Sequence, residues 1–110
     1  MPLFIKKEQF TQETLSLLPE IKKQYLADHK IWVKELIASG KNISSGYLTD
    51  QERNPGGGGL LFIEATNFEE AKDIIQQDPM IRNNLVNWEI QEWVPVAGNL
   101  LEQFNVDKFA

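Results

Sequence analysis

Runs and alternations of apolar residues along the chain predict four strands. Leu60 to Thr66 is apolar except for Glu64, and so short a β-rich run is typical of a buried strand. Apolar residues then alternate with polar ones, as in a strand with one buried face, at Val86, Trp88, Ile90 and Val94. Pro2 to Lys6 predicts a first strand. Asn42 to Leu48 predicts a second, although Ser44, Ser45 and Gly46 weaken its pattern.

A period of 3.6 residues predicts a long helix from Pro19 to Ser39. Proline suits the first turn, where its missing N–H leaves no hydrogen bond unmade, and Glu20 follows it favourably. Gly40 is expected to end the helix as a left-handed cap. The apolar stripe consists of Ile21, Tyr25, Leu26, Trp32, Val33, Leu36 and Ile37.

A shorter second helix is expected between Asn67, which can cap it, and Asp78. Phe68, Ala71 and Ile75 form its apolar stripe. The residue before a proline is driven out of the α region, so the helix should stop near Asp78. Asp78 and Pro79 equally suit the start of a further turn through Arg82, with Asp78 as its cap.

The polar segment from Lys7 to Leu18 is expected to be a loop with at most a helical turn, and the turn-rich segment from Thr49 to Gly59 a flexible loop. Its four glycines do not form a phosphate-binding loop, because no Lys-Ser/Thr pair follows and the segment leads into a strand. Residues 1–96 are expected to form one domain. Residues 97–110 form an apolar-rich tail that should dock on the domain or on a partner subunit.

The predicted order is strand, helix, strand, strand, helix, strand. It indicates a ferredoxin-like α+β sandwich, with a four-stranded antiparallel sheet and both helices on one face. The other face would be bare. A second copy could cover it in a two-fold dimer, as in a dimeric α+β barrel, or it could be left for a ligand in a monomer.

Composition excludes several classes of function. The net charge of −5, without a dense Lys/Arg cluster, argues against a nucleic-acid surface. No run is long enough to span a membrane and the N-terminal region does not read as a signal peptide, so a cytoplasmic location is expected. One histidine and no cysteine are too few ligands for a zinc site, and no cofactor motif is present. We therefore expect no metal and no cofactor.

His29 is the main candidate for chemistry. A helical projection at about 100° per residue places it beside Tyr25 and Leu36, inside the apolar stripe, where a polar ring needs a partner. Histidine is also the residue type that ordinarily titrates near neutral pH. Asp78 shares the apolar side of the second helix and could accept the ring N–H, fixing the tautomer. Ser45 and Tyr47 could line the same cleft as substrate-binding residues.

Structural readings of the same residues stay open. His29 could be a hydrogen-bonded core residue, Asp78 a helix cap, and Ser45 and Tyr47 ordinary strand residues. Trp32, Trp88 and Trp93 are expected in the core or at a dimer contact.

The chain resembles the YCII-related (YciI-like) proteins, a branch of the dimeric α+β barrel group. The resemblance spans roughly residues 20 to 94 and is carried by Tyr25-Leu26-x-x-His29-x-x-Trp32-Val33-x-x-Leu36, Gly40, Gly46, Gly59-Leu60-Leu61-x-Ile63-x-Ala65, Glu69-Glu70-Ala71, Gln77-Asp78-Pro79 and Glu89-Ile90-x-x-Trp93. It implies a dimer with a cleft in each subunit and a His–Asp pair, which falls on His29 and Asp78. Asn83-Asn84 stands where a glycine is expected, and Asn also tolerates a left-handed conformation.

Two functions follow as hypotheses. The first is a metal-independent small-molecule enzyme in which His29 and Asp78 carry out general acid/base proton transfer, in isomerisation, dehydrohalogenation or lactone-type chemistry. The second is a non-catalytic dimeric module that binds an unidentified small ligand or serves as an accessory to another protein.

Overall fold

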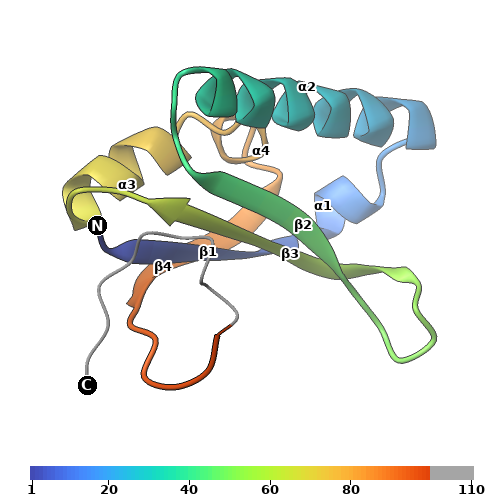
Figure 1. The fold of residues 1–110 in the computed structure, drawn as a ribbon. Coiled ribbons are helices and arrows are strands. Elements are labelled where there is room, and N and C mark those ends of the chain that lie inside the picture. Colours follow the sequence, from blue (N-terminus) through green and yellow to red (C-terminus); the bar gives the residue numbers. More distant parts are fainter. Residues whose placement is uncertain (100–110) are drawn as a thin grey trace.

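A single antiparallel sheet with helices over one face makes up residues 1–99, the part of the chain that the computed structural model describes (Figure 1). The strands are β1 (Leu3–Phe10), β2 (Ile43–Thr49), β3 (Pro55–Glu64) and β4 (Val86–Trp93). The helices are α1 (Gln12–Leu15), α2 (Pro19–Ala38), α3 (Phe68–Ile75) and α4 (Pro79–Arg82). The strand order β2-β3-β1-β4 confirms the predicted α+β class with an antiparallel sheet.

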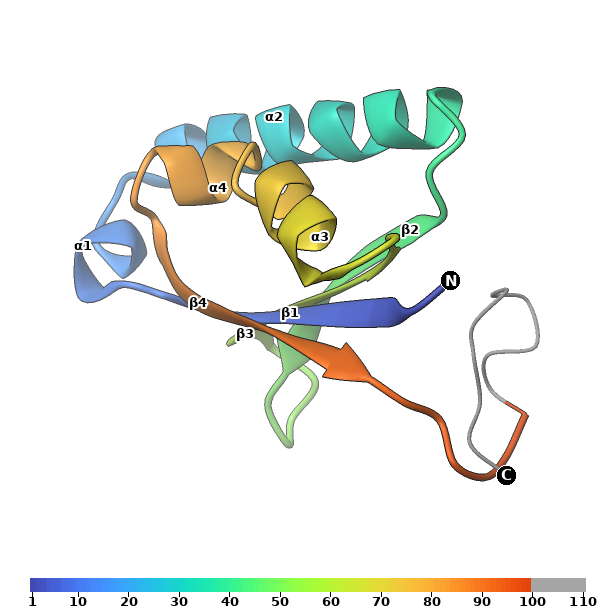
Figure 2. The ribbon, with the colours of Figure 1, turned by 90° about the vertical axis from the view of Figure 1, so that its left-hand side faces the viewer.

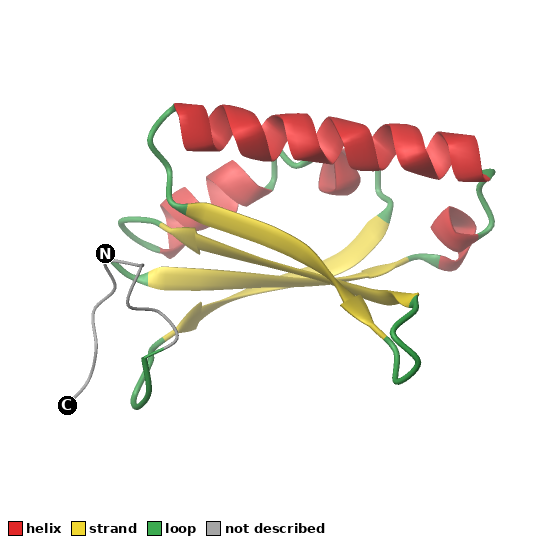
Figure 3. Cartoon of the chain, turned by 45° about the vertical axis from the view of Figure 1, so that its right-hand side comes forward, coloured by secondary structure: helices red, strands yellow, loops and turns green. Residues whose placement is uncertain are grey.

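The long helix α2 lies across the sheet, and the shorter α3 and α4 lie beside it in the same layer (Figures 2 and 3). Directly opposed residues of antiparallel strands share a face of the sheet. Lys6 is opposite Leu61 on β3 and Ile90 on β4, so all three face the helix layer. The buried core on this face consists of Phe4, Ile43, Leu61, Ile63, Ala65, Ala71 and Ile75.

Helix α2 has the predicted ends. Pro19 occupies its first turn, and Gly40 follows it with a φ of 96°. The apolar stripe is only partly used, because Ile21, Leu26 and Ile37 are 42%, 42% and 53% exposed. The half-buried members of the stripe are Tyr25, Trp32, Val33 and Leu36. The helix therefore contacts the core through only four of the seven residues of the predicted stripe.

The segment from Lys7 to Leu18 is more ordered than predicted. Strand β1 continues to Phe10, which pairs with Val86 of β4, and α1 follows. The Thr11 hydroxyl caps α1 by accepting a hydrogen bond from the Thr14 N–H at 3.2 Å. The helical turn expected in this segment is α1, but the loop prediction was wrong for residues 7–10. This part of β1 carries polar residues on both faces, so the sequence shows no apolar alternation.

The glycine-rich segment is also largely a strand. Strand β3 begins at Pro55, so the predicted loop from Thr49 to Gly59 shrinks to the turn around residues 50–54. Gly58, with a φ of 96°, lies so close to β1 that a Cβ atom there would sit 2.2 Å from the Glu8 carbonyl oxygen. Glycines inside a strand permit such close backbone approach, and the composition of the segment was therefore misleading.

The second predicted helix stops earlier than expected, at Ile75. Asp78 instead caps α4 by accepting a hydrogen bond from the Met80 N–H at 3.0 Å, as the alternative interpretation proposed. Asn84 has a φ of 56°, so the left-handed turn survives without a glycine.

Two further predictions concern the C-terminal tail and membrane-spanning helices. Residues 100–110 of the predicted tail lie outside the described residues. Among residues 1–99, no helix combines the length and apolarity needed to cross a membrane.

Candidate active site

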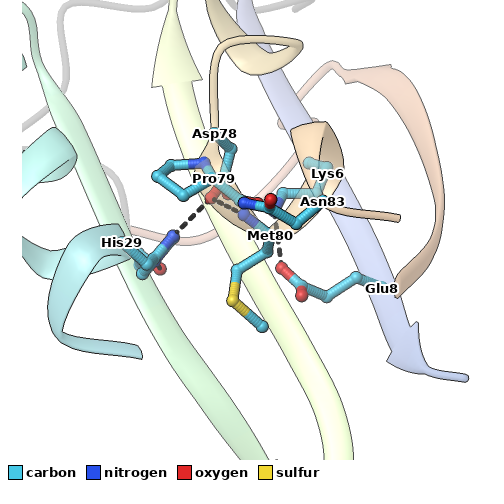
Figure 4. Close-up of polar contacts among 8 residues, drawn as sticks. Lys6, Glu8, His29, Asp78, Pro79, Met80 and Asn83 are labelled. Carbon is cyan, nitrogen blue, oxygen red and sulfur yellow. Dashed lines mark hydrogen bonds and ion pairs between the residues drawn. The ribbon is translucent and has the colours of Figure 1, made fainter. Parts of the chain in front are cut away.

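Five polar side chains from the sheet, α2 and the start of α4 form a continuous chain of hydrogen bonds and ion pairs. Figure 4 shows four of them: Glu8, Lys6, Asp78 and His29. Lys6 donates from Nζ to Glu8 Oε1 at 2.5 Å and to Asp78 Oδ2 at 3.0 Å. His29 Nδ1 lies 2.9 Å from Asp78 Oδ1. On the other side of the ring, Nε2 lies 2.8 Å from Ser45 Oγ. The order of the chain is Glu8, Lys6, Asp78, His29, Ser45.

Helix and strand periodicity bring His29 and Ser45 together. His29 lies on the same side of α2 as the half-buried Tyr25 and Leu36, and its side chain is only 13% exposed. Its ring lies 5.8 Å from the Trp32 ring, centroid to centroid. Ser45 is opposite the core residue Leu61, so it points from β2 toward the helix layer. The two side chains therefore meet between α2 and the edge of the sheet.

Asp78 is fully buried, and both of its oxygens accept hydrogen bonds. Oδ1 accepts from His29 and from the Met80 N–H, and Oδ2 accepts from Lys6, which is itself 0% exposed. Burial opposes ionisation of this carboxyl. The hydrogen bond from His29, the charges of Lys6 and His29, and the Met80 N–H outweigh that effect and hold the pKa of Asp78 below its ordinary value. Asp78 is therefore a carboxylate at neutral pH.

An ionised Asp78 decides the tautomer of His29. A carboxylate only accepts hydrogen bonds, so His29 Nδ1 must carry the proton that lies between them. In the neutral ring Nε2 is then the acceptor, and the Ser45 hydroxyl donates to it. The basic nitrogen of His29 consequently faces away from Asp78, toward Ser45.

His29 and Ser45 both line a cleft of about 400 Å³ between α2, β1, β2 and β3. Asp78 does not line this cleft and lies behind the imidazole. The walls combine apolar side chains with a few polar groups and with the bare backbone of three glycines. They consist of Phe10, Leu26, Val33 and Met80; Glu8, His29, Lys30, Lys34, Ser45 and Tyr47; and Gly46, Gly58 and Gly59. Its volume and largely apolar walls suit a small organic ligand.

All four residues singled out from the sequence lie at this place. His29, Asp78 and Ser45 are joined by hydrogen bonds. Tyr47 lines the cleft but is 70% exposed, so it lies at the mouth. Within residues 1–99, no three His, Cys, Asp or Glu side chains are grouped closely enough to hold a metal ion.

Sequence reasoning missed Lys6 and Glu8. A signal was present, since Lys6 and Glu8 continue the alternation of Phe4 toward the helix layer. A lysine at an inward position of a strand requires a buried carboxylate partner. Lys6 and Glu8, which interrupt the apolar pattern, could thus have been predicted as site residues.

The chain matches one protein-family model and resembles solved structures of the same fold. The model of the YCII-related domain matches residues 3–94. No curated protein matches the chain.

Two solved structures share the fold. The 5-chloro-2-hydroxyhydroquinone dehydrochlorinase TftG from Burkholderia phenoliruptrix AC1100, solved with 2,5-dihydroxybenzoquinone, aligns with a TM-score of 0.58 and 19% identity, covering 83% of this chain and 92% of that one. The de novo designed protein Ferredog-Diesel aligns with a TM-score of 0.54 and 16% identity, covering 83% and 84% of the two chains.

Proposed function

The chain belongs to the YCII-related family, and from that premise we propose that it is a small-molecule enzyme in which His29 acts as general base and general acid, oriented by Asp78. One observation carries the proposal. The buried Asp78 carboxylate holds His29 through Nδ1 at 2.9 Å, and the opposite nitrogen lies 2.8 Å from Ser45 Oγ, in a pair of residues that lines a cleft of ligand size. This is the arrangement that general acid/base catalysis requires.

In the proposed reaction the bound substrate takes the place of the Ser45 hydroxyl hydrogen at His29 Nε2. Nε2 then removes a proton from the substrate, and Asp78 stabilises the resulting imidazolium. Return of the proton to a different atom completes an isomerisation. In a dehydrohalogenation, the electron pair left by the proton expels the halide, and the imidazolium later releases its proton to solvent. Positioned proton transfer of this kind contributes about 10²–10⁴-fold to rate.

Dehydrohalogenation is favoured among the reaction classes by the structural neighbour. TftG is by name a dehydrochlorinase and shares the fold of this chain. Fold alone does not assign a reaction, so activity must be tested on this protein directly.

The test is a turnover screen with small chlorinated hydroxyaromatic, carbonyl and lactone compounds against the wild type and His29→Ala. We expect His29→Ala to keep the fold and to lose at least about 10²-fold in rate on any active compound. Asp28→Asn is the matched control, because this neighbouring carboxylate contacts Gln24 and not the cleft. Unchanged turnover by His29→Ala would refute the proposal.

A second pair of variants distinguishes proton transfer from nucleophilic attack by Ser45, since Asp78, His29 and Ser45 also have the order of a hydrolase triad. Ser45→Ala should reduce turnover by at most about tenfold if Ser45 only holds the imidazole through one hydrogen bond. Ser44→Ala, which changes the opposite face of β2, should have no effect. Loss of activity by Ser45→Ala as complete as by His29→Ala would instead identify Ser45 as the nucleophile.

We further propose that a second copy of the chain covers the face of the sheet opposite the helices. Phe62 and Trp93 lie on this face with ring centroids 6.0 Å apart, and Leu48 is 42% exposed. Sedimentation should show a dimer that Leu48→Lys weakens and Tyr47→Lys, on the opposite face of β2, does not. A wild-type monomer would remove this proposal.

The second candidate function, a non-catalytic binding module, uses the same cleft. In that case His29→Ala should change ligand affinity while no compound is turned over by the wild type. The apolar walls and the single basic nitrogen suit retention of a small molecule equally well.

A further inference from the structure

Glu8 is an ionisable group in the cleft that the proposed proton transfer does not use. Its side chain lines the cavity and is 11% exposed. Oε1 accepts a hydrogen bond from Lys6 at 2.5 Å, whereas no residue among 1–99 hydrogen-bonds to Oε2. One carboxylate oxygen of Glu8 is thus available to a ligand.

The neighbouring strand leaves room for Glu8 in this position. Gly59 is directly opposite Glu8, and a Cβ atom at Gly59 would lie 3.1 Å from Glu8 Cγ and 3.3 Å from its Oε1. Any larger residue would press on the Glu8 side chain. Because Gly59 has no side chain, the Glu8 side chain can lie beside β3 inside the cleft.

Glu8 and His29 lie at separate places in the cavity. Glu8 comes from β1 and His29 from α2, and the Met80 side chain lies between them (Figure 4). Phe10 and Val33 add further apolar wall. A ligand that reaches both polar groups must therefore have an apolar body with polar atoms at two positions.

We propose that Glu8 binds the ligand by accepting a hydrogen bond from one of its hydroxyl groups, so that the cleft selects small, largely apolar compounds that carry a hydroxyl group. A carboxylate only accepts hydrogen bonds, hence the ligand must supply the donor. An ether, or an anionic group at the same position, offers no proton to Glu8. This inference rests on the proposed function in one respect only, that the cleft beside His29 is the ligand-binding site.

The test uses three probes of one shape and a falling number of donors: resorcinol, 3-methoxyphenol and 1,3-dimethoxybenzene. Binding is followed by backbone amide shifts of Ser45, Gly46 and Gly59 in NMR titrations. The wild type should bind resorcinol about tenfold or more tighter than 1,3-dimethoxybenzene, because hydrogen bonds to charged groups are the stronger ones.

Glu8→Gln should abolish this preference. Lys6 can only donate hydrogen bonds, so it holds the amide oxygen of the new side chain, and the NH₂ group then replaces Oε2 in the cleft. The acceptor becomes a donor with little change in shape. Glu8→Gln should then bind 1,3-dimethoxybenzene as tightly as the wild type does, or more tightly, and should bind resorcinol more weakly.

A second pair of variants keeps the test independent of the folding of Glu8→Gln. Gly59→Ala should displace the Glu8 side chain and reduce the preference for resorcinol. Gly46 lines the same cleft, and a Cβ atom there would have nothing within 4 Å. Gly46→Ala should therefore keep the preference for resorcinol.

Failure of this proposal can be told apart from failure of the proposed function. His29→Ala should still bind resorcinol more tightly than 1,3-dimethoxybenzene, because Glu8 is unchanged, whether or not His29 is catalytic. Equal binding of resorcinol and 1,3-dimethoxybenzene by the wild type, including no binding of either, would overturn the role of Glu8. A preference unchanged in both Glu8→Gln and Gly59→Ala would overturn it as well.

Discussion

Replacement of Lys6 by methionine tests whether the buried charges depend on one another. Methionine keeps most of the length and apolar character of the stem but removes the ammonium. Asp78, which is 0% exposed, then keeps its hydrogen bonds from His29 and Met80 but loses its cation. Glu8 loses its only ion-pair partner among the described residues.

The expected loss is large for a domain of this size. Breaking a buried ion pair by removing one partner costs about 3–5 kcal/mol, whereas a whole domain is typically stable by only about 5–15 kcal/mol. Lys7 provides the matched control, since it is the next residue of β1, is 59% exposed and pairs with Glu89 at 3.8 Å. Lys7→Met should therefore change the free energy of unfolding by no more than about 1 kcal/mol.

Urea unfolding followed by fluorescence, at one protein concentration, measures both variants. At pH 7 Lys6→Met should lose several times more stability than Lys7→Met. The difference should shrink below about pH 4, where the carboxyls become protonated and no unpaired charge remains buried. Equal effects of the two substitutions, or a pH-independent loss for Lys6→Met, would refute the reasoning.

Two further predictions concern acid stability and the approach of two strands. The folded-state pKa of Asp78 is lowered, so its stabilising contribution is present above the unfolded-state value of about 3.9 and is lost as pH falls through the folded-state value. Asp78→Asn should be less stable than the wild type at pH 7 and should lose less stability between pH 7 and acid, as urea midpoints will show; parallel profiles would contradict this. Gly56 and Gly58 both have positive φ, but only a Cβ at Gly58 meets the Glu8 carbonyl oxygen, at 2.2 Å. Gly58→Ala should therefore be more destabilising than Gly56→Ala by about 1–3 kcal/mol in the same assay, and equal losses would argue against close contact of the strands.

Locally encoded features could be predicted well from the sequence. The ends of α2 follow from Pro19 and Gly40, and the cap of α4 follows from Asp78 before Pro79, because steric and hydrogen-bond preferences act over a few residues. The position of His29 on the inner side of α2 follows from helical period alone.

The extent of the strands could not be predicted with the same success. The inward positions Lys6 and Glu8 are charged, and the start of β3 is a run of glycines, so neither segment shows the apolar alternation of a strand. Both segments form strands because each has a neighbour on either side with which its backbone can hydrogen-bond: β1 lies between β3 and β4, and β3 lies between β2 and β1.

The sequence by itself determined the order of the elements, the face on which His29 lies and the types of residue available for chemistry. Only the tertiary structure decided which of these residues meet. Asp78 is separated by 49 residues from His29 and by 72 from Lys6, and Ser45 reaches His29 from a different element. Such contacts depend on strand register and on the seating of α2 over the sheet, which local periodicity does not specify.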